Sequence, residues 1–335
     1  MVHDKMVNIK RLFDSNALWL SMVIGVIGHK WLLPLSPTLP WWIFFMLFFT
    51  FCKVNPLDLR LHKWHWVVLA AQIIFSLGSY VGIYLLTGNR VLAQGLMLCF
   101  IMPTATAAPI IAGKMGGSIQ NLTTFTLLSN IAISIIVPAV FPLVNPLAEK
   151  AFWPAFLLIL RHIAPLLLGP FLAAWLLRIG YEWHTKKEFV LSTQLAQIPF
   201  YLWVCSIIVL TAVVTETTIS NFQSQISNML ILLASSFFAC LLQFGLGKLI
   251  GYYLPAPSKG RDYQDVLVNP AAAPKTMAGV SSITAGQAFG QKNTSLGVWM
   301  ANTYLDPMAS LGAAAYIIWQ NIFNSVQLFV VAHKK

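Results

Sequence analysis

Polar side chains interrupt two otherwise apolar stretches of this chain, and they are the residues that could do chemistry. Residues 102–109 combine two prolines with the hydroxyl side chains of Thr104 and Thr106. Residues 285–295 contain a longer polar run: Gln287, Gln291, Lys292, Asn293, Thr294 and Ser295. Ionisable and hydrogen-bonding groups inside an apolar span are costly, so they usually face a cavity, a partner or a solute pathway. This pattern predicts recognition of a small polar or charged solute.

Bond-breaking chemistry is not predicted. Hydrolysis inside a membrane needs a nucleophile beside a base, or two acids, and no two carboxylates and no Ser–His pair share a predicted depth. The four cysteines, Cys52, Cys99, Cys205 and Cys240, stand singly in apolar stretches, where each is interpreted as a small hydrophobic residue. We therefore expect no enzyme, no metal site built from clustered ligands and no cofactor, with sodium left open.

The composition indicates that these segments lie in lipid. Of 335 residues, 58% are hydrophobic and 9% are charged, whereas soluble domains carry about 25% charged residues. The net charge of +11 falls mainly in short loops between apolar runs, so we expect lipid and not nucleic acid as the partner. At about 20 residues per crossing, the apolar residues suffice for some ten helices.

Ten membrane spans are predicted, and they leave little room for other domains. They cover residues 17–36, 39–54, 64–86, 91–112, 121–144, 151–178, 194–215, 227–254, 280–303 and 308–332. Residues 262–282 are only weakly apolar, and we expect a cytoplasmic loop there, with an extension of the ninth span as the alternative. The predicted fold class is an all-α polytopic membrane protein.

The basic residues predict an orientation. With the N-terminus in the cytoplasm, sixteen lysines and arginines lie in inside segments, and only Arg90 and Lys150 lie in outside loops. Cytoplasmic loops carry an excess of these residues. We therefore expect a multi-pass protein of the cell (inner) membrane with both termini in the cytoplasm.

Two of the ten spans should be broken helices. Pro103 and Pro109 remove backbone donors, and the polar run of residues 285–295 opposes a plain apolar helix. Broken backbone at membrane depth is tolerated only where it lines a cavity or is buried in protein. The breaks fall in the fourth and ninth spans, which predicts two inverted five-helix repeats, residues 1–148 and 149–335, as in alternating-access transporters.

Three segments together resemble the bile acid:sodium symporter family: residues 103–107, 290–297 and 317–322. The resemblance extends over about residues 15–330. It implies a panel domain from spans 1, 2, 6 and 7, and a core domain from spans 3–5 and 8–10. The broken spans 4 and 9 would cross in the core and face a substrate cavity. The implied function is secondary active transport of a small organic anion, bile-acid-like or another carboxylate, by alternating access.

The sodium ligands of that family have no match in this sequence. The family's Ser–Asn pair falls at Ala108 and Pro109, its glutamate at Ala288 and its glutamine at Lys292. Sodium prefers hard oxygen ligands, which alanine and proline side chains do not offer. The resemblance therefore predicts weakened or absent sodium coupling.

Lys292 suggests a replacement for the missing ion. Its ammonium could sit where a sodium ion would, hydrogen-bonded by Thr123 or Thr126, by Gln287 and by carbonyls of the unwound segment. Three alternatives stay open: a lysine that snorkels to the interface, one that pairs directly with an anionic substrate, and one that couples transport to protons.

The expected substrate contacts are the polar side chains of both broken spans. They are Thr104, Thr106, Gln287, Gln291, Asn293 and Thr294. The threonines could instead bond to carbonyls of their own turn, and Asn293 could cap a half-helix. The alternative functions are a sodium-coupled symporter with relocated ligands and a non-transporting membrane sensor. The oligomeric state is left open.

Overall fold

The structure is a computed structural model that describes residues 16–145, 151–256 and 276–333. These residues are all-helical, and the β-type pairing among them is the isolated bridge between Thr104 and Lys292. The predicted helical class is therefore confirmed. For residues 262–282 we expect a loop, with an extension of the ninth span as the alternative. Residues 262–275 lie outside the described part of the chain, and a helix begins at Met277.

The helices of the described residues follow one another along the chain. They are Asn16–Ile27, α2 (His29–Leu32), η1 (Leu33–Thr38), α3 (Leu39–Phe51), η2 (Pro56–Asp58), α4 (Lys63–Thr87), α5 (Arg90–Ile101), α6 (Ala108–Lys114), α7 (Ile119–Val144), α8 (Phe152–Thr185), η3 (Leu195–Gln197), α9 (Ile198–Tyr253), α11 (Met277–Gly290), α12 (Thr294–Tyr304), η5 (Pro307–Ala309) and α13 (Ser310–His333).

Six helical segments of the described residues are long and apolar enough to cross a membrane. They are His29–Phe51, Lys63–Thr87, Ile119–Val144, Phe152–Thr185, Leu195–Tyr253 and Pro307–Val331. A multi-pass membrane protein is therefore supported. The six differ from the ten predicted spans for three reasons. The first span is a short helix, Asn16–Ile27, the fourth and ninth spans are each divided into two short helices, and the seventh and eighth lie in one helix.

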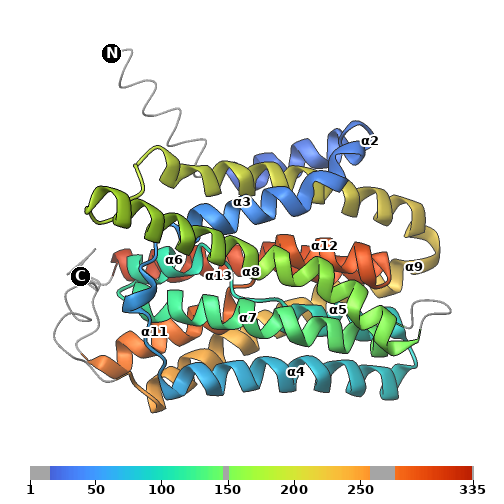
Figure 1. The fold of residues 1–335 in the computed structure, drawn as a ribbon. Coiled ribbons are helices and arrows are strands. Elements are labelled where there is room, and N and C mark those ends of the chain that lie inside the picture. The colour runs from blue at the N-terminus through green and yellow to red at the C-terminus, as the bar shows by residue number, and fades with distance from the viewer. Residues whose placement is uncertain (1–15, 146–150, 257–275, 334–335) are drawn as a thin grey trace, which may run out of the picture.

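That helix is α9, whose 56 residues would extend about 84 Å if straight, far more than a bilayer core of about 30 Å. Figure 1 shows α9 curving back at the right of the view. Its first limb (residues 198–216) reaches the N-terminal helices, where Glu216 meets His29. Its second limb (residues 227–253) contacts the centre, where Gln243 meets Cys99.

Local signals set several helix ends. Gly88 ends α4 in the left-handed conformation, with φ of 65°, which glycine adopts without steric cost. The Asn89 side chain then accepts a hydrogen bond from Leu92 N at 3.2 Å and caps α5. Ser118 caps α7 in the same way through Asn121 N. These caps satisfy amides that the first helical turn leaves unpaired.

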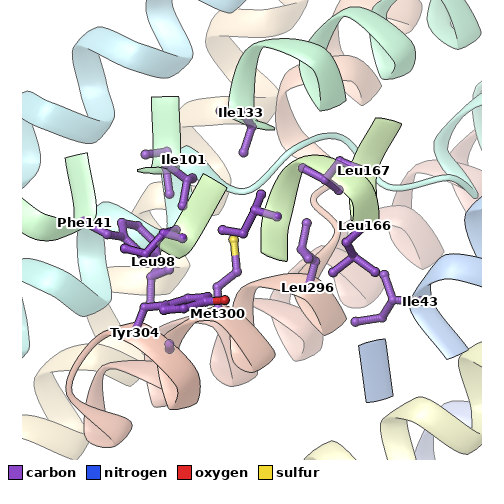
Figure 2. Packing of buried hydrophobic residues seen from close by; sticks show 14 of the residues in the cluster. Ile43, Leu98, Ile101, Ile133, Phe141, Leu166, Leu167, Leu296, Met300 and Tyr304 are labelled. Atoms are coloured by element: carbon purple, nitrogen blue, oxygen red, sulfur yellow. The ribbon is translucent and has the colours of Figure 1, made fainter. Parts of the chain in front are cut away.

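A buried apolar cluster joins α3 and α8 to α5, α7 and α12. Figure 2 shows Leu296 of α12 beside Leu166 of α8, and Tyr304 beside Phe141 of α7. All four of these residues are at least nine-tenths buried. The cluster therefore packs α3 and α8 against α12 along its length, from Leu296 to Tyr304.

Candidate functional site at the crossing of two broken helices

The first break separates α5 from α6. The α-helical hydrogen bonds of α5 end at Met102, and α6 begins at Ala108 with Pro109 in its first turn. Proline has no amide hydrogen to donate and is tolerated at a helix start, where that donor would be unpaired. Residues 102–107, which lie between the two helices, do not form a regular helix. Their backbone carbonyls and amides, and those of the adjoining helix ends, need partners that lipid cannot provide.

The second break separates α11 from α12 at residues 291–293. Asn293 starts α12, because its Oδ1 accepts a hydrogen bond from Leu296 N at 3.2 Å. Gly290 ends α11 where a side chain has no room: a Cβ there would collide with the ring of Phe244. The polar run of the sequence therefore contains both the stop and the restart of this helix.

The two breaks cross and pair through their backbones. Thr104 and Lys292 form an antiparallel bridge, in which Ala105 N donates to Gln291 O at 2.9 Å and Asn293 N donates to Pro103 O at 2.8 Å. Each break thus satisfies backbone groups that the other leaves free, as buried backbone requires.

A side-chain bond adds to this pairing. The Thr104 hydroxyl donates to Ala288 O at 2.7 Å. It links the first break to the last turn of α11.

The carbonyl end of α5 receives donors from three other elements. Gln243 of α9 donates to Cys99 O at 3.1 Å, and Lys292 Nζ donates to Phe100 O at 3.0 Å. Gln72 of α4 donates to Ile101 O at 3.1 Å and to Met102 O at 3.0 Å. The last carbonyls of a helix have no partner within it, so these side chains complete the half-helix.

Lys292 is fully enclosed, with 1% of its surface exposed. Its ammonium lies 5.1 Å from the centroid of the Phe289 ring. Two ion pairs occur among the described residues, His29 with Glu216 and Arg178 with Glu182, and neither involves Lys292. The interface-snorkelling alternative therefore does not describe this side chain.

The titratable groups around Lys292 come from three helices. They are the thiols of Cys99 on α5 and Cys240 on α9, and the phenol of Tyr316 on α13. The Tyr316 hydroxyl donates to Gly290 O at 2.7 Å, and Gln243 donates to the same hydroxyl at 3.1 Å. These groups are uncharged in their ordinary state, so none supplies a counter-charge.

The local contacts can sustain the ammonium form. A lysine at the centre of a membrane helix costs about 2.5–3.5 kcal/mol on insertion scales. A charged hydrogen bond contributes about 1.5–3 kcal/mol, and an aromatic face contributes about 2 kcal/mol to a desolvated cation. The carboxyl end of α5 also carries partial negative charge from its helix dipole. These contacts offset part of that cost.

The structure brings most of the predicted site residues to the crossing. Thr104, Gln287, Gln291, Lys292, Asn293 and Thr294 are all at least nine-tenths buried there. Thr106 lies in the same break but is partly exposed. Thr123 and Thr126 lie on α7.

The predicted partners of the Lys292 ammonium are different. The hydroxyls of Thr123 and Thr126 donate to the carbonyls of Ile119 and Leu122, one turn back in their own helix, which is the usual geometry of threonine within a helix. Gln287 instead donates to Asn324 Oδ1 of α13 at 3.1 Å. The ammonium bonds to a helical carbonyl, that of Phe100.

Several residues at the crossing were missed by sequence reasoning. Gln72, Gln243 and Asn324 are buried amides on α4, α9 and α13, and Gln320 Oε1 accepts a hydrogen bond from Lys292 N at 2.9 Å. The available signal was a single amide side chain in an otherwise apolar span. Such residues commonly bond across helices in membrane proteins.

The second break also keeps unused hydrogen-bonding capacity. In the part of the chain that the structure describes, five buried polar atoms near this break make no hydrogen bond: Gln287 Oε1, Gln291 Oε1, Asn293 Nδ2, Ser295 Oγ and Asn324 Nδ2. Buried polar atoms are paired in the large majority of cases. These atoms are therefore candidates for binding a polar solute or water.

The residues at the family's sodium positions do not fit sodium. Ala108 and Ala288 are fully buried, Pro109 lies in the first turn of α6, and none of these three residue types has a side-chain oxygen. At the fourth position stands the ammonium of Lys292, a donor and not a ligand.

Comparison with known proteins gave no match: neither a protein-family model nor a curated protein matches this chain.

Proposed function

We propose that this protein is a secondary transporter of a small organic anion that works by alternating access and without sodium coupling. The observation that carries the proposal is the crossing itself. Two helices are interrupted at the same place, their unwound segments pair, and a buried lysine sits between them. Discontinuous helices with free polar groups are the usual construction of a transporter's substrate site.

The order of elements in the two halves supports an inverted repeat. In the first half, α4 precedes the broken pair α5 and α6, and α7 follows it. In the second half, the second limb of α9 precedes the broken pair α11 and α12, and α13 follows it. Counting α9 as two crossings and each broken pair as one gives three core helices per half, as the ten-span fold requires.

A division into two moving parts is also supported. The proposed panel consists of the N-terminal helices, α3, α8 and the first limb of α9, and the proposed core of the remaining helices. Between α3 and α8 on one side and α12 on the other, the contacts are mainly apolar, as at Leu166 and Leu296. One hydrogen bond also joins them, between His162 of α8 and the hydroxyl of Tyr304 at 3.0 Å. A mainly apolar interface with few directional bonds would allow one part to move against the other.

The anion would bind at the free polar atoms of the second break. Asn293 Nδ2 is a free donor, and the nearby ammonium supplies positive charge. Gln291 and Thr106, which also belong to the two breaks, would add polar contacts. The protein would lie in the cell membrane with both termini in the cytoplasm, as the positive-inside bias indicates.

Flux measurements test this function. Purified protein in liposomes is offered labelled cholate, pantothenate and pyruvate, each in sodium, in potassium and with a proton gradient. We expect saturable uptake of at least one acid above protein-free liposomes, and equal uptake in sodium and potassium. Uptake that sodium alone drives would indicate a sodium symporter with relocated ligands. Saturable binding without flux would indicate a sensor.

A further inference from the structure

The further inference concerns the charge of the substrate site and rests on the proposed function. Residues 102–109 and 285–295, which form the crossing, contain one charged side chain, Lys292. The two ion pairs of the described residues lie elsewhere in the fold. Within these two segments, protonated Lys292 thus has no acidic side chain to balance its charge.

The position of this charge ties it to both broken helices. Lys292 belongs to the second break, its backbone pairs with Thr104 of the first break, and its ammonium bonds to Phe100 O of α5. A charge held in this way stays with the site when access changes from one side of the membrane to the other. It would therefore act in every transport step, loaded or empty.

We infer that Lys292 is a built-in counter-charge, which makes the loaded site neutral and the empty site positive, and that the substrate is a monovalent organic anion such as a monocarboxylate. A neutral site changes access without moving charge through the membrane field. A dianion would leave an uncompensated negative charge in a low-dielectric interior, which is costly.

Two transport modes follow from this assignment. Exchange of one anion for another uses only the neutral, loaded site, so its rate does not depend on the membrane potential. Net transport must also return the empty, positive site, and it moves one negative charge per cycle. An inside-negative potential would then favour export, since it drives an unaccompanied anion outward.

The two modes can be separated in liposomes with valinomycin and a potassium gradient. Cholate, pantothenate and pyruvate are each measured as tracer exchange at equal concentrations, and as net efflux into anion-free buffer. A potassium gradient of up to about 100-fold sets a membrane potential that would balance an equal gradient of a monovalent anion. Over this range of potential, the rate of exchange should change less than about twofold. The rate of net efflux should change strongly with the potential. At equilibrium, the anion gradient should approach about 100-fold.

Variants extend the comparison. Lys292→Gln removes the charge, so its loaded site is negative and its exchange should become dependent on the potential. Lys292→Arg keeps the charge and should exchange as the wild type does. Lys114→Gln, at an exposed position on α6, is the matched control. The comparison of the two modes in the wild type needs no variant to fold.

Each contrary result has a distinct meaning. Wild-type exchange that depends on the potential as strongly as net efflux overturns the counter-charge. Net efflux that follows an imposed pH gradient at zero potential also overturns it, because Lys292 would then exchange its proton among uncharged neighbours, Cys99, Cys240 and Tyr316. No flux of any of the three acids in either mode overturns the proposed function itself.

Discussion

Lys292 donates from its ammonium to the carbonyl oxygen of Phe100, 3.0 Å away, and so caps the carboxyl end of a half-helix that belongs to the other half of the chain. A cation is stabilised at this end of a helix by the peptide dipoles. The same bond fills a position where the resembled family uses an ion. It links the stability of the crossing to the proposed transport site.

Chemical rescue would test whether the ammonium itself is needed. Lys292→Ala leaves the Phe100 carbonyl without its donor and opens a space the length of the lysine side chain. We expect transport to fall at least about tenfold, and millimolar methylammonium to restore part of it, because a free ammonium can enter a space lined by carbonyls. Measured flux that tetramethylammonium restores equally well would argue against a specific cation position.

The sodium response should change when the family's residues are restored. In Ala288→Glu with Lys292→Gln, a carboxylate and an amide oxygen replace a methyl group and an ammonium. We predict that uptake becomes dependent on sodium, since hard oxygen ligands then stand at two of the family's positions. Flux of the double variant and of the wild type, each in sodium and in potassium, checks this. An unchanged cation response would count against the proposed role of Lys292.

A substitution at Asn293 can distinguish a role in substrate binding from a role in helix capping. Asn293→Asp keeps the oxygen that accepts from Leu296 N but replaces the free Nδ2 donor with a negative oxygen. We expect the apparent KM for the anion to rise at least about tenfold while thermal stability changes little. Asn302→Asp, also on α12, is the control. An unchanged KM would remove Asn293 from the substrate site.

Gln72 should contribute mainly to stability. Gln72→Leu leaves the carbonyls of Ile101 and Met102 without this donor, and each buried unpaired carbonyl costs about 1–3 kcal/mol. We expect a clear decrease in the melting temperature in detergent. Gln223→Leu, exposed on α9, should melt as the wild type does. Equal melting of the two variants would show that the α5 end does not depend on Gln72.

Close packing between α9 and α11 can be tested within one helix. A Cβ at Gly247 would collide with the carbonyl of Ala285, whereas one at Gly245 meets nothing within 4 Å. Gly247→Ala should therefore destabilise by about 1–3 kcal/mol. Gly245→Ala should be neutral or stabilise by up to about 1 kcal/mol. Thermal unfolding of both proteins measures the difference, and the reverse order would contradict this packing.

The sequence by itself determined the helical membrane class and the places where two helices break. These features are local: apolar composition over some twenty residues selects a membrane helix, and Pro103 and Pro109 remove donors wherever they stand. The capping role of Asn293, one of two alternatives, also depends only on residues three apart.

Only the tertiary structure decided which groups meet at the crossing. The pairing of Thr104 with Lys292 and the donors from Gln72 and Gln243 join residues that are far apart in the sequence, and no local pattern encodes their register. Thr123 was expected beside Lys292, but its hydroxyl bonds within its own helix because that carbonyl is always in reach. Hydrogen bonds in an apolar interior go to the nearest acceptor in space, and folding alone establishes which acceptor that is.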